Sequence, residues 1–535
     1  MDYFDYIIVG SGSSGAVVAS RIAEKKKYSV LLIEAGGKDY HPWLHIPIGV
    51  GKTLTNPKFV WNYNTEPEPE LFGKSIYWPR GKVLGGSSSI NGMVYVRGAS
   101  HKYDEWREGN KPGWGYEELL PYFKKIEDAS YSDNKDRGKG GPIGVSTGNY
   151  QDKLSSSFYQ ACIDSGAKPN DDYNLKFDGV GWLQYSVKNG MRSSTSSYLK
   201  LVKKNKHFQI KIKSEVEKII FDGNKAVGVF YKTGDVLHEV RANAEVILAA
   251  GPINSPKILE LSGIGNANLL KSHGIKSKYH LPGVGENLTD HLQTRITYET
   301  KLKVTVNDIL NNKFLGALEM LRYAFKRNGL MSIASATVQS IMKSDPSKLH
   351  PDLKIQLMLI SGQNRYARNK KIGLDPFPGF SVGVFPIYPA SRGSTHLRSN
   401  NPSEHPIIRA GYLSEKKDQD LTVKGLLLVR EIMSQAVISE HVIREVRPGI
   451  SVKDYNGLLN YARNNGQTSW HAISTCRMGK SKMDVVDYKL QVYGTENLRV
   501  IDSSIMPNMP TSNTNVPSMV IGEKGSDLIL EKSKT

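Results

Sequence analysis

The first 34 residues hold the feature that most constrains the fold of this chain. An apolar run at residues 6–9 leads into the sequence GSGSSG, residues 16–24 then show helical spacing, and residues 30–33 form a second apolar run. Strand, tight turn, helix and strand in this order predict a βαβ unit of the usual length. Such units build doubly wound, mostly parallel sheets, so we expect an α/β fold.

The turn inside this unit has the spacing GxGxxG, with two serines among the glycines: Gly10, Gly12, Ser13, Ser14 and Gly15. In dinucleotide-binding folds these glycines permit the tight turn, the approach of a pyrophosphate to the backbone, and close packing of helix on strand. The helix N-terminus then offers free N–H groups to the phosphates. Glu34 ends the next strand, roughly 20 residues on, where an acidic side chain binds ribose hydroxyls. An ordinary glycine-rich turn is the alternative, but the complete unit predicts a dinucleotide site.

A second stretch dense in glycine and serine, residues 81–98, reads GKVLGGSSSINGMVYVRG. Such residues leave little side chain between the backbone and a ligand. A flexible linker is the alternative, but linkers do not usually carry apolar side chains. This stretch contains several: Val83, Leu84, Ile90, Met93 and Val94. No second GxGxxG opens a βαβ unit, so we expect one bound dinucleotide, and a loop shaped to a large planar ring favours FAD over NAD.

Length and cysteine usage limit the class of protein. With 535 residues, of which 39% are hydrophobic, the chain is long enough for about two domains. Cys162 and Cys476 allow at most one disulfide and no cysteine-based metal site, which suits a reducing compartment, and no metal is expected. We see no signal-peptide pattern at the N-terminus and no apolar run of the roughly 20 residues that span a bilayer. We therefore expect a cytoplasmic protein, at most peripheral to the inner face of a membrane.

The formal net charge of +19 raises the question of a nucleic-acid partner. The lysines are spread along the chain rather than gathered with aromatic residues into one block. The densest groups, around Lys25 and Lys203, resemble a helix end and a surface turn. We therefore expect a solvated basic surface and no nucleic-acid binding. Weak attraction to anionic lipid remains open.

The pattern along the chain divides it into two kinds of segment. Short strands and helices of the nucleotide-binding type occur in the first part, return after residue 190, and end in a glycine-rich apolar helix that needs a sheet to pack against. Between residues 300 and 455 the helices and strands alternate differently. We expect a dinucleotide-binding domain made from residues 1–155, 190–300 and 456–535, and an inserted α+β substrate-binding domain made from residues 301–455 with 156–189.

Four separated segments carry a family likeness: residues 81–104, then GPINSPKILELSGIG at 251–265, TSWHAISTCRMG at 468–479 and NTNVPSMVIGEKGSDLI at 513–529. In this order they resemble the signatures of the glucose–methanol–choline (GMC) family of flavin oxidoreductases, in its choline and alcohol dehydrogenase-like branch. The likeness covers essentially the whole chain. It implies a Rossmann-like FAD-binding domain with an inserted substrate-binding domain.

The resemblance also implies a reaction, the FAD-dependent oxidation of a primary alcohol to the aldehyde. In this family a histidine takes the hydroxyl proton while the α-hydrogen leaves as hydride to the flavin. The resemblance places that histidine at His471 and the residue that holds the substrate oxygen at Asn515. The chemistry needs such a pair, because an alkoxide is a far better hydride donor than an alcohol. A structural histidine and a loop or cap asparagine are the alternatives.

Further contacts to FAD follow from the same resemblance. Near the adenosine they are Ala35, Trp61 and Val216, and beside the pyrophosphate and ribityl chain they are Asp502 and Ser503. Under the isoalloxazine they are Ser88, Asn91, Gly92 and Met93. We also expect four further contacts to the cofactor: Gly85, Val94, Ala250 and Trp470. Some relatives attach FAD covalently through a histidine of the first signature. Ile90 occupies that place here, so we expect non-covalent FAD.

The substrate is less constrained by the sequence. Choline requires an aromatic cage and preferably a carboxylate. The segment 329–344 contains no acid, and the nearest acids on either side of it are Glu319 and Asp345. Its apolar and neutral side chains suggest either a neutral pocket or core packing: Met331, Ile333, Thr337 and Val338. We expect a neutral primary alcohol, aliphatic or aromatic, with choline as the alternative.

The electron acceptor is left open among quinone, another carrier and oxygen. A flavin photodecarboxylase or lyase on the same scaffold, and a flavin-binding protein without catalysis, are the competing hypotheses. Bleaching of the flavin by alcohols in the dark would separate them from an alcohol-oxidising enzyme.

Overall fold

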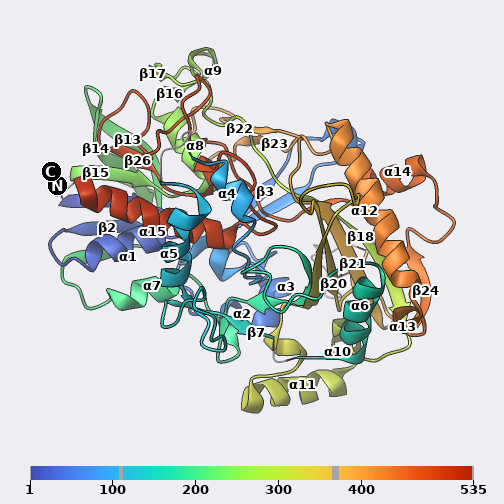
Figure 1. Ribbon diagram of the computed structural model, residues 1–535. Coiled ribbons are helices and arrows are strands. Elements are labelled where there is room, and N and C mark those ends of the chain that lie inside the picture. Colours follow the sequence, from blue (N-terminus) through green and yellow to red (C-terminus); the bar gives the residue numbers. More distant parts are fainter. Residues whose placement is uncertain (1, 108–112, 149, 364–372, 533–535) are drawn as a thin grey trace.

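The computed structural model describes residues 2–107, 113–148, 150–363 and 373–532. Two seven-stranded sheets dominate this part of the chain, each with its own layer of helices and its own large hydrophobic core (Figure 1). The α/β architecture expected from the sequence is confirmed.

The first sheet has the strand order β12-β2-β1-β15-β14-β13, with β26 paired to β15. The strands β12, β2, β1, β15 and β26 run parallel, while β15, β14 and β13 form an antiparallel meander. Their bounds are β1 Asp2–Val9, β2 Val30–Ile33, β12 Phe208–Lys211, β13 Ser214–Asp222, β14 Lys225–Thr233, β15 Val236–Leu248 and β26 Leu498–Val500.

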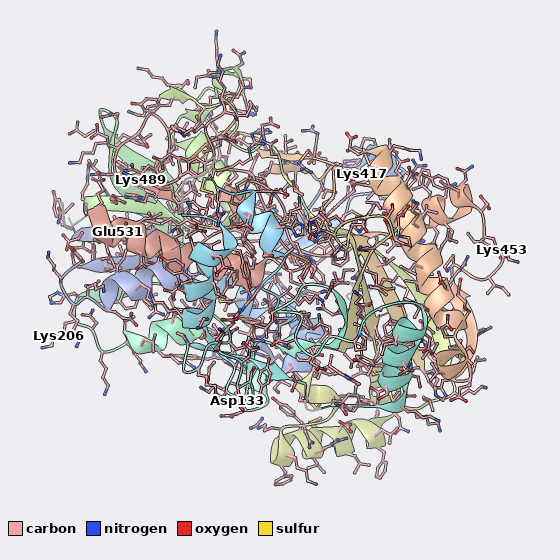
Figure 2. The ribbon with its side chains drawn as sticks, in the orientation of Figure 1. Asp133, Lys206, Lys417, Lys453, Lys489 and Glu531 are labelled. Carbon is pink, nitrogen blue, oxygen red and sulfur yellow. The ribbon has the colours of Figure 1, made fainter. Side chains whose placement is uncertain are left out.

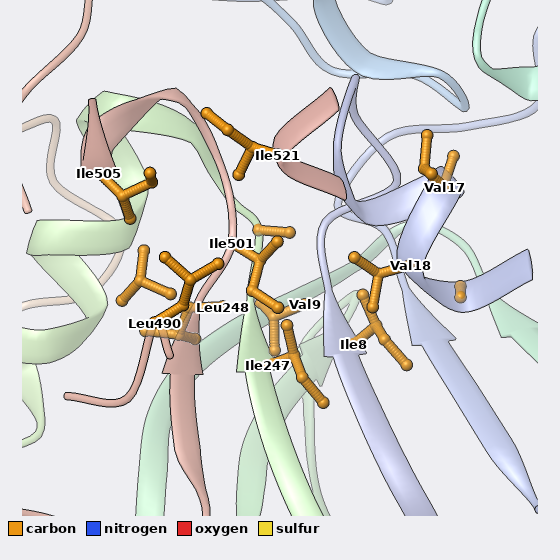
Figure 3. Close-up of a cluster of buried hydrophobic side chains, with 14 of the residues drawn as sticks. Ile8, Val9, Val17, Val18, Ile247, Leu248, Leu490, Ile501, Ile505 and Ile521 are labelled. Atoms are coloured by element: carbon orange, nitrogen blue, oxygen red, sulfur yellow. The ribbon is translucent and has the colours of Figure 1, made fainter. Parts of the chain in front are cut away.

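Helices from both ends of the chain pack together on this sheet. Helix α1 (Gly15–Ala23) connects β1 to β2, and the C-terminal helix α15 (Asn515–Lys532) lies against it, so the two termini are neighbours (Figure 1). Figure 3 shows the core beneath them, where Ile8, Val18 and Ile521 approach Ile501. The apolar helix at the C-terminus therefore packs on the first sheet, as expected. The strands of this sheet come from segments about 500 residues apart.

The second sheet is antiparallel, in the order β24-β18-β21-β20-β19-β8, with β25 paired to β18. Its strands are β8 Gly179–Trp182, β18 Leu292–Thr300, β19 Ala336–Met342, β20 Leu353–Met358, β21 Gly379–Pro386, β24 Val442–Arg447 and β25 Gln467–Thr468. This sheet takes in β18 and β25, which lie inside the segments 190–300 and 456–535 that the sequence led us to expect in the cofactor-binding part.

Helices cover the outer face of the second sheet (Figure 1). They are α6 Lys153–Asp164, α12 Lys416–Ser434, α13 Ala436–Ser439 and α14 Tyr455–Asn465. At Gly425 of α12 an added Cβ would lie 2.7 Å from Cγ2 of Val384 on β21, so glycine lets helix and sheet approach closely. Two further helices, α10 (Val306–Asn311) and α11 (Lys313–Lys326), lie at the edge of this half of the molecule.

Shorter elements connect the two halves. The helices among them are α2 Pro42–His45, α3 Val50–Thr53, α4 Ser100–Asp104, α5 Tyr116–Ile126, α7 Ser196–Leu201, α8 Gly251–Leu261 and α9 Ala267–Ser272. Small two-stranded sheets include β3 (Val60–Asn64) with β4 (Tyr77–Gly81), and β22 (Ser394–His396) with β23 (Ile407–Arg409).

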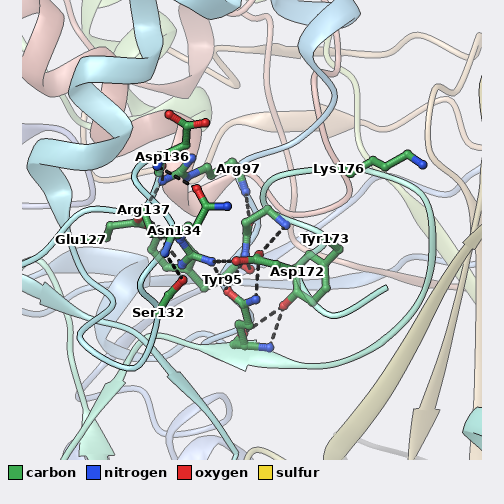
Figure 4. A network of polar contacts seen from close by, with 12 residues as sticks. Tyr95, Arg97, Glu127, Ser132, Asn134, Asp136, Arg137, Asp172, Tyr173 and Lys176 are labelled. Carbon is green, nitrogen blue, oxygen red and sulfur yellow. Dashed lines mark hydrogen bonds and ion pairs between the residues drawn. The ribbon is translucent and has the colours of Figure 1, made fainter. Parts of the chain in front are cut away.

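A buried polar network fixes the end of the stretch 81–98 (Figure 4). Glu127 accepts from Arg97 at 2.5 Å and from Nε of Arg137 at 2.9 Å, and Arg137 also donates to Asp172 at 2.6 Å. The backbone N–H of Arg97 donates to Asn174 at 2.6 Å. Each buried charge therefore has a partner, as burial of charged groups requires, and the loop is held at a defined place.

The surface charge is dispersed. The labelled Lys206, Lys417 and Lys453 lie on different sides of the molecule (Figure 2). None of the helices within the described ranges has the length and apolarity needed to cross a bilayer. The same ranges contain no cluster of three or more His, Cys, Asp or Glu that could hold a metal ion.

Candidate active site

A long cavity runs from the turn after β1 to the inner face of the second sheet. Most of the residues expected from the sequence line it: Gly10, Gly12, Ser13, Ser14, Glu34, Ala35, Trp61, Asn91, Gly92, Met93, Val94, Val216, Ala250, Trp470, His471, Asp502, Ser503 and Asn515. They come from nine separate stretches of sequence. The fold thus brings the βαβ turn, the stretch 81–98 and the C-terminal segments to one place.

Three expected cofactor contacts lie behind the cavity wall rather than on it. A Cβ on Gly15 would lie 1.9 Å from the carbonyl oxygen of Gly10, so this glycine serves close packing. Gly85 adopts φ +84° at the start of a 3₁₀ turn. The Ser88 hydroxyl donates to the Gly85 carbonyl at 2.6 Å and accepts from the Thr195 N–H at 3.0 Å. Gly15 therefore packs within the βαβ turn, and Gly85 and Ser88 shape the loop 81–98 from behind the cavity wall.

Glu34 lies at the carboxyl end of β2, on the cavity wall. One carboxylate oxygen accepts from the backbone N–H and the hydroxyl of Ser11, at 2.9 and 2.7 Å, and the other from the Gly36 N–H at 2.7 Å. Burial raises the pKa of Glu34, and these hydrogen bonds act in the opposite direction. The oxygen that accepts from Gly36 can still accept from a further donor, because a carboxylate oxygen has two lone pairs and only one of its pair is used.

The cavity fits an elongated dinucleotide. A Cβ added to Gly12 or Gly92 would have no atom within 4 Å, so these glycines leave the backbone open to a ligand. The N-termini of α1, α8 and α15 all reach the cavity, and helix N-termini attract phosphate groups. Arg80 is buried and gives Nη1 to the carbonyl of Trp470 at 2.8 Å, while its Nε and Nη2 have no partner among the described residues. These features suit the phosphates and polar ring edges of FAD.

At the other end of the cavity, Asp290 holds the segment that carries His471. Its carboxylate accepts from the backbone N–H of His471 at 2.6 Å, from the Thr468 hydroxyl at 2.5 Å and from the Tyr412 hydroxyl at 2.5 Å. Trp78 adds its indole N–H at 3.1 Å. Because one buried carboxylate receives all these donors, the backbone of His471 has a single, well-determined position.

The hydrogen bonds of two histidines define which nitrogen of His471 carries a proton. Nε2 of His291 lies 2.7 Å from the carbonyl oxygen of Ile387, and since a carbonyl only accepts, this nitrogen bears the hydrogen. Nδ1 of the neutral His291 ring is then an acceptor, and Nδ1 of His471, 2.9 Å away, donates to it. Nε2 of His471 is left with a lone pair, which faces the side-chain nitrogen of Asn513 at 3.0 Å.

Both histidine rings are neutral at ordinary pH. Burial lowers the pKa of His291 to about 4, and burial lowers the pKa of His471 well below its usual value, with His291 and Lys354 adding to the effect. The lowered pKa values agree with the hydrogen bonds, which require both rings to be neutral. His471 therefore presents an unprotonated nitrogen to the cavity.

The structure places Asn513, not Asn515, beside His471. Asn515 begins α15, and its side-chain oxygen accepts from the hydroxyl of Ser13 at 2.7 Å, at the dinucleotide turn. The expectation that Asn515 would stand next to the histidine is therefore wrong in position by two residues. Asn515 still lines the cavity, but at the end where the phosphates would lie.

Lys354, on β20, orients the Asn513 amide. Its ammonium nitrogen lies 2.8 Å from the amide oxygen of Asn513 and 3.3 Å from the hydroxyl of Ser512. With its oxygen held by a cationic donor, the Asn513 amide turns its N–H₂ toward His471. The side chain is completely buried with no carboxylate bonded to it, and burial lowers the pKa of Lys354 to about 7.

The signals for these additional residues in the sequence are weak. Asn513 lies within the quoted segment NTNVP, where either asparagine fits the pattern. Asp290 and His291 stand together in ENLTDH, directly before β18, and an adjacent acid and histidine are a usable signal. Lys354 interrupts the apolar run LKIQLM, and nothing in such a run distinguishes a lysine that points inward.

The reactive end of the cavity is lined by residues of the second sheet, with Ser335 directly before β19: Gln293, Arg295, Ser335, Gln356, Met358 and Phe385. Of the four residues proposed for a neutral substrate pocket, only Met331 lines a cavity, which adjoins this one. Ile333 and Val338 belong to the hydrophobic core, and the Thr337 hydroxyl lies 2.7 Å from that of Ser155. For these three, core packing is the observed role.

Comparison with known proteins gives a consistent result. Two family models, both described as GMC oxidoreductase, match residues 4–293 and 389–522. The oxygen-dependent choline dehydrogenase of Brucella anthropi is 38% identical over 533 residues, which is 99% of this chain and 96% of that protein. The enzyme of the same name from Vibrio vulnificus is 37% identical, over 99% of this chain and 95% of that one.

Solved structures agree over the full length. A formate oxidase is 25% identical with a TM-score of 0.92, and the match covers 100% of this chain and 99% of that one. Pyridoxine 4-oxidase from Mesorbium loti is 26% identical with a TM-score of 0.87, over 98% of both chains.

Proposed function

This chain belongs to the GMC oxidoreductase family, and from that premise we propose that His471 takes the hydroxyl proton of a primary alcohol while Asn513 holds the alcohol oxygen. The protein is an FAD-dependent enzyme that acts on CH–OH donors. The finer assignments concern which residues carry the reaction and which alcohol enters.

His471 acts as the general base. Its Nε2 lone pair accepts the hydroxyl proton, and the resulting imidazolium is stabilised through Nδ1–H, which already donates to His291 at 2.9 Å. Bound FAD supplies the two-electron acceptor for the hydride that leaves the carbinol carbon, so the alcohol becomes the aldehyde. Asn513 donates its side-chain N–H to the developing alkoxide without adding charge.

The observation that carries this proposal is the fixed tautomer of His471. A carbonyl, His291 and His471 form one directional chain that ends in an unprotonated nitrogen. Asn513 now donates to that nitrogen at 3.0 Å, and an alcohol entering between them would accept from Asn513 and donate to His471. Both partners thus have the polarity that alcohol activation needs.

Substitution of each residue tests the assignment. We expect His471→Ala to abolish the alcohol-dependent bleaching of the flavin under anaerobic conditions while the yellow cofactor stays bound. Asn513→Ala should slow bleaching by 10²-fold or more, as when one oxyanion donor is removed. The matched variant Asn515→Ala should reduce FAD retention with less effect on the rate per bound flavin. Bleaching by His471→Ala at the wild-type rate would exclude the base assignment.

The name of the relatives suggests choline as the substrate, but the lining of the cavity favours another alcohol. The carboxylates that line it are Glu34, Glu215 and Asp502, beside residues of the dinucleotide end. Among the described residues of the reactive end none is acidic, whereas a quaternary ammonium group prefers aromatic faces with a carboxylate. We therefore propose a primary alcohol other than choline.

The remaining proposals concern cofactor attachment, electron acceptor and location. Ile90 stands where some relatives carry the linking histidine, so FAD should be released on acid denaturation. Readmission of air after anaerobic bleaching distinguishes the acceptors: rapid return of the yellow colour indicates oxygen, and slow return indicates a quinone or another carrier. We propose a cytoplasmic location, with at most peripheral membrane contact.

A further inference from the structure

A second cavity, here called the vestibule, adjoins the reactive end of the site. It has a volume of about 1210 Å³ and lies between α2 and α3, the strand β18, the helices α10 and α11, and the end of α14. Five residues line both spaces: Leu54, Gln293, Arg295, Ala334 and Ser335. The vestibule therefore borders the chamber that contains His471 across these shared residues.

The lining of the vestibule is basic. The side chains of the described lining that are charged at neutral pH are all cations: Lys52, Lys74, Arg295, Lys313 and Arg447. The chain as a whole has 71 basic and 52 acidic residues, so composition alone would place acids in a lining of this size. The complete lack of Asp and Glu among the described lining residues is thus a property of this cavity.

The partners of three of these cations show how their charge is accommodated. Arg447 is compensated by Asp375, at 3.0 and 2.5 Å. Lys52 lies over the ring of Trp43, 3.9 Å from its centre, and Lys74 donates to the backbone and side-chain oxygens of Asn464. Neither lysine has a carboxylate within ion-pair distance among the described residues. A concave lining with one sign of charge attracts ligands of the opposite sign.

Arg295 lies at the inner end of the vestibule. Gln293 and Arg295 alternate with their neighbours at the start of β18, so their side chains share one face of the strand, and His291 directly precedes it. At about 3.4 Å per residue, the Cα of Arg295 lies about 14 Å from that of His291. The Gln293 side-chain oxygen accepts from Nε of Arg295 at 2.8 Å, and Tyr461 donates to its backbone oxygen at 2.6 Å. The guanidinium is thereby fixed at the junction of the two spaces.

We propose that the vestibule, with Arg295 at its inner end, binds an acid group of the substrate, so that this enzyme oxidises primary alcohols bearing a carboxylate or phosphate several bonds from the hydroxyl. The inference rests on the proposed function, because it requires the carbinol at His471. Arginine suits the role, since its planar guanidinium binds carboxylates and phosphates through paired hydrogen bonds. A choline-like cation would meet like charge throughout the vestibule.

Alcohols matched in length and different at the far end test this proposal. With the FAD-loaded enzyme, we would compare 6-hydroxyhexanoate, 6-hydroxyhexyl phosphate, 1-hexanol and 6-amino-1-hexanol under anaerobic conditions. We expect kcat/KM to be highest for one of the two anions and lowest for the cation, mainly through KM. The better anion identifies the acid group. Equal values for anion and neutral alcohol, or a preference for the cation, would overturn the inference.

The variant Arg295→Met tests the assigned residue. We expect the ratio of kcat/KM for the anionic alcohol to that for 1-hexanol to fall about 10- to 100-fold, the usual effect of losing a charged hydrogen bond, with partial recovery in Arg295→Lys. Lys453→Met removes an exposed lysine far from the cavity and should leave the ratio unchanged. An unchanged ratio in Arg295→Met would contradict the role of Arg295.

A binding measurement separates this inference from the proposed function. Hexanoate has no hydroxyl to oxidise, and we expect calorimetry to show that it binds the wild type more tightly than Arg295→Met. If the wild type oxidises 1-hexanol but neither prefers the anionic alcohols nor binds hexanoate, only the vestibule inference fails. If no alcohol bleaches the flavin while hexanoate binds, the proposed function fails instead.

Discussion

The basicity of His471 is set by residues that no substrate touches. Its Nδ1–H donates to His291, which is itself oriented by the Ile387 carbonyl. Without His291 as an acceptor, the His471 ring could rotate or change tautomer. The sequence could indicate His471, because its neighbours form a recognisable segment, but not the direction of the hydrogen bonds, which depends on a carbonyl nearly 100 residues from His291.

We predict that His291→Leu lowers the rate of flavin bleaching by an alcohol about 10²-fold, because a general base that is wrongly oriented loses most of its effect. His291→Asn should recover part of the rate, since its side-chain oxygen can accept from His471. Stopped-flow absorbance measures the rate, and the flavin spectrum before mixing checks that FAD is bound. A wild-type rate in His291→Leu would contradict the role of the histidine chain.

Burial of the Lys354 ammonium group lowers the free energy of unfolding, and the size of this loss depends on pH. Burial lowers its pKa from 10.5 to about 7, so between these values the unfolded chain binds more protons than the folded one. Stability therefore rises with pH across this window, and the cost is complete below pH 7. We predict that Lys354→Met raises the urea midpoint relative to the wild type at pH 6, and that this difference shrinks toward pH 10. Lys453→Met, at an exposed site, should show no such trend.

The choice between Asn513 and Asn515 could not be made from the sequence. Asn513 and Asn515 have the same chemistry and lie two positions apart. Which one faces His471 depends on where α15 begins, and the helix begins at Asn515. Helix starts are uncertain from sequence by more than this spacing, so the choice required the structure.

Among the elements, helices α1 and α15 are in tight contact at Gly522. A Cβ at Gly522 would lie 2.8 Å from the backbone oxygen of Ser14 and 2.9 Å from Cβ of Val17. We predict that Gly522→Ala destabilises the protein by about 1–3 kcal/mol, as overpacking does, and weakens FAD retention because Ser13 and Asn515 lie at this contact. Thermal unfolding and flavin release measure both effects.

The control for this substitution is Gly51→Ala in the short helix α3. A Cβ there would meet no atom within 4 Å, so alanine should be neutral or slightly stabilising. Equal losses in both variants would show that the effect at Gly522 does not come from crowding between helices.

The elements themselves were largely predictable, whereas their grouping was not. The β1–α1–β2 unit and the C-terminal helix have clear periodicity, and the structure contains both. Strand β18 was expected with the cofactor-binding segments but pairs with β21 and β24. Its residues are buried on both faces for most of its length, so the pattern of the strand alone does not show which sheet it joins.

At the scale of the whole molecule, the candidate site depends on the meeting of two sheets. The first sheet presents the dinucleotide end, and the second contributes Gln293, Gln356 and Phe385 at the reactive end. The family likeness allowed this arrangement to be expected, because its segments occur in order along the chain. The basic vestibule was not expected, because its lining comes from short, dispersed segments whose lysines look like ordinary surface residues.

We predict that a chain ending at residue 497 does not retain FAD, because it lacks β26, Asp502, Asn513 and α15. A variant lacking only residues 533–535 is the matched control and should retain it. Absorbance near the flavin band after gel filtration measures retention. Stoichiometric flavin on the chain that ends at residue 497 would show that the C-terminal segments are dispensable for binding.

The pairing of Ser13 with Asn515 links the two ends of the polypeptide at the place where the phosphates would lie. During synthesis Ser13 leaves the ribosome 502 residues before Asn515 does. We therefore expect the complete phosphate site to form, and FAD to load, only after α15 has been made. In chains that lack flavin, α1 and α15 should be the helices that proteases cleave first, because the bound cofactor no longer stabilises the place where they meet.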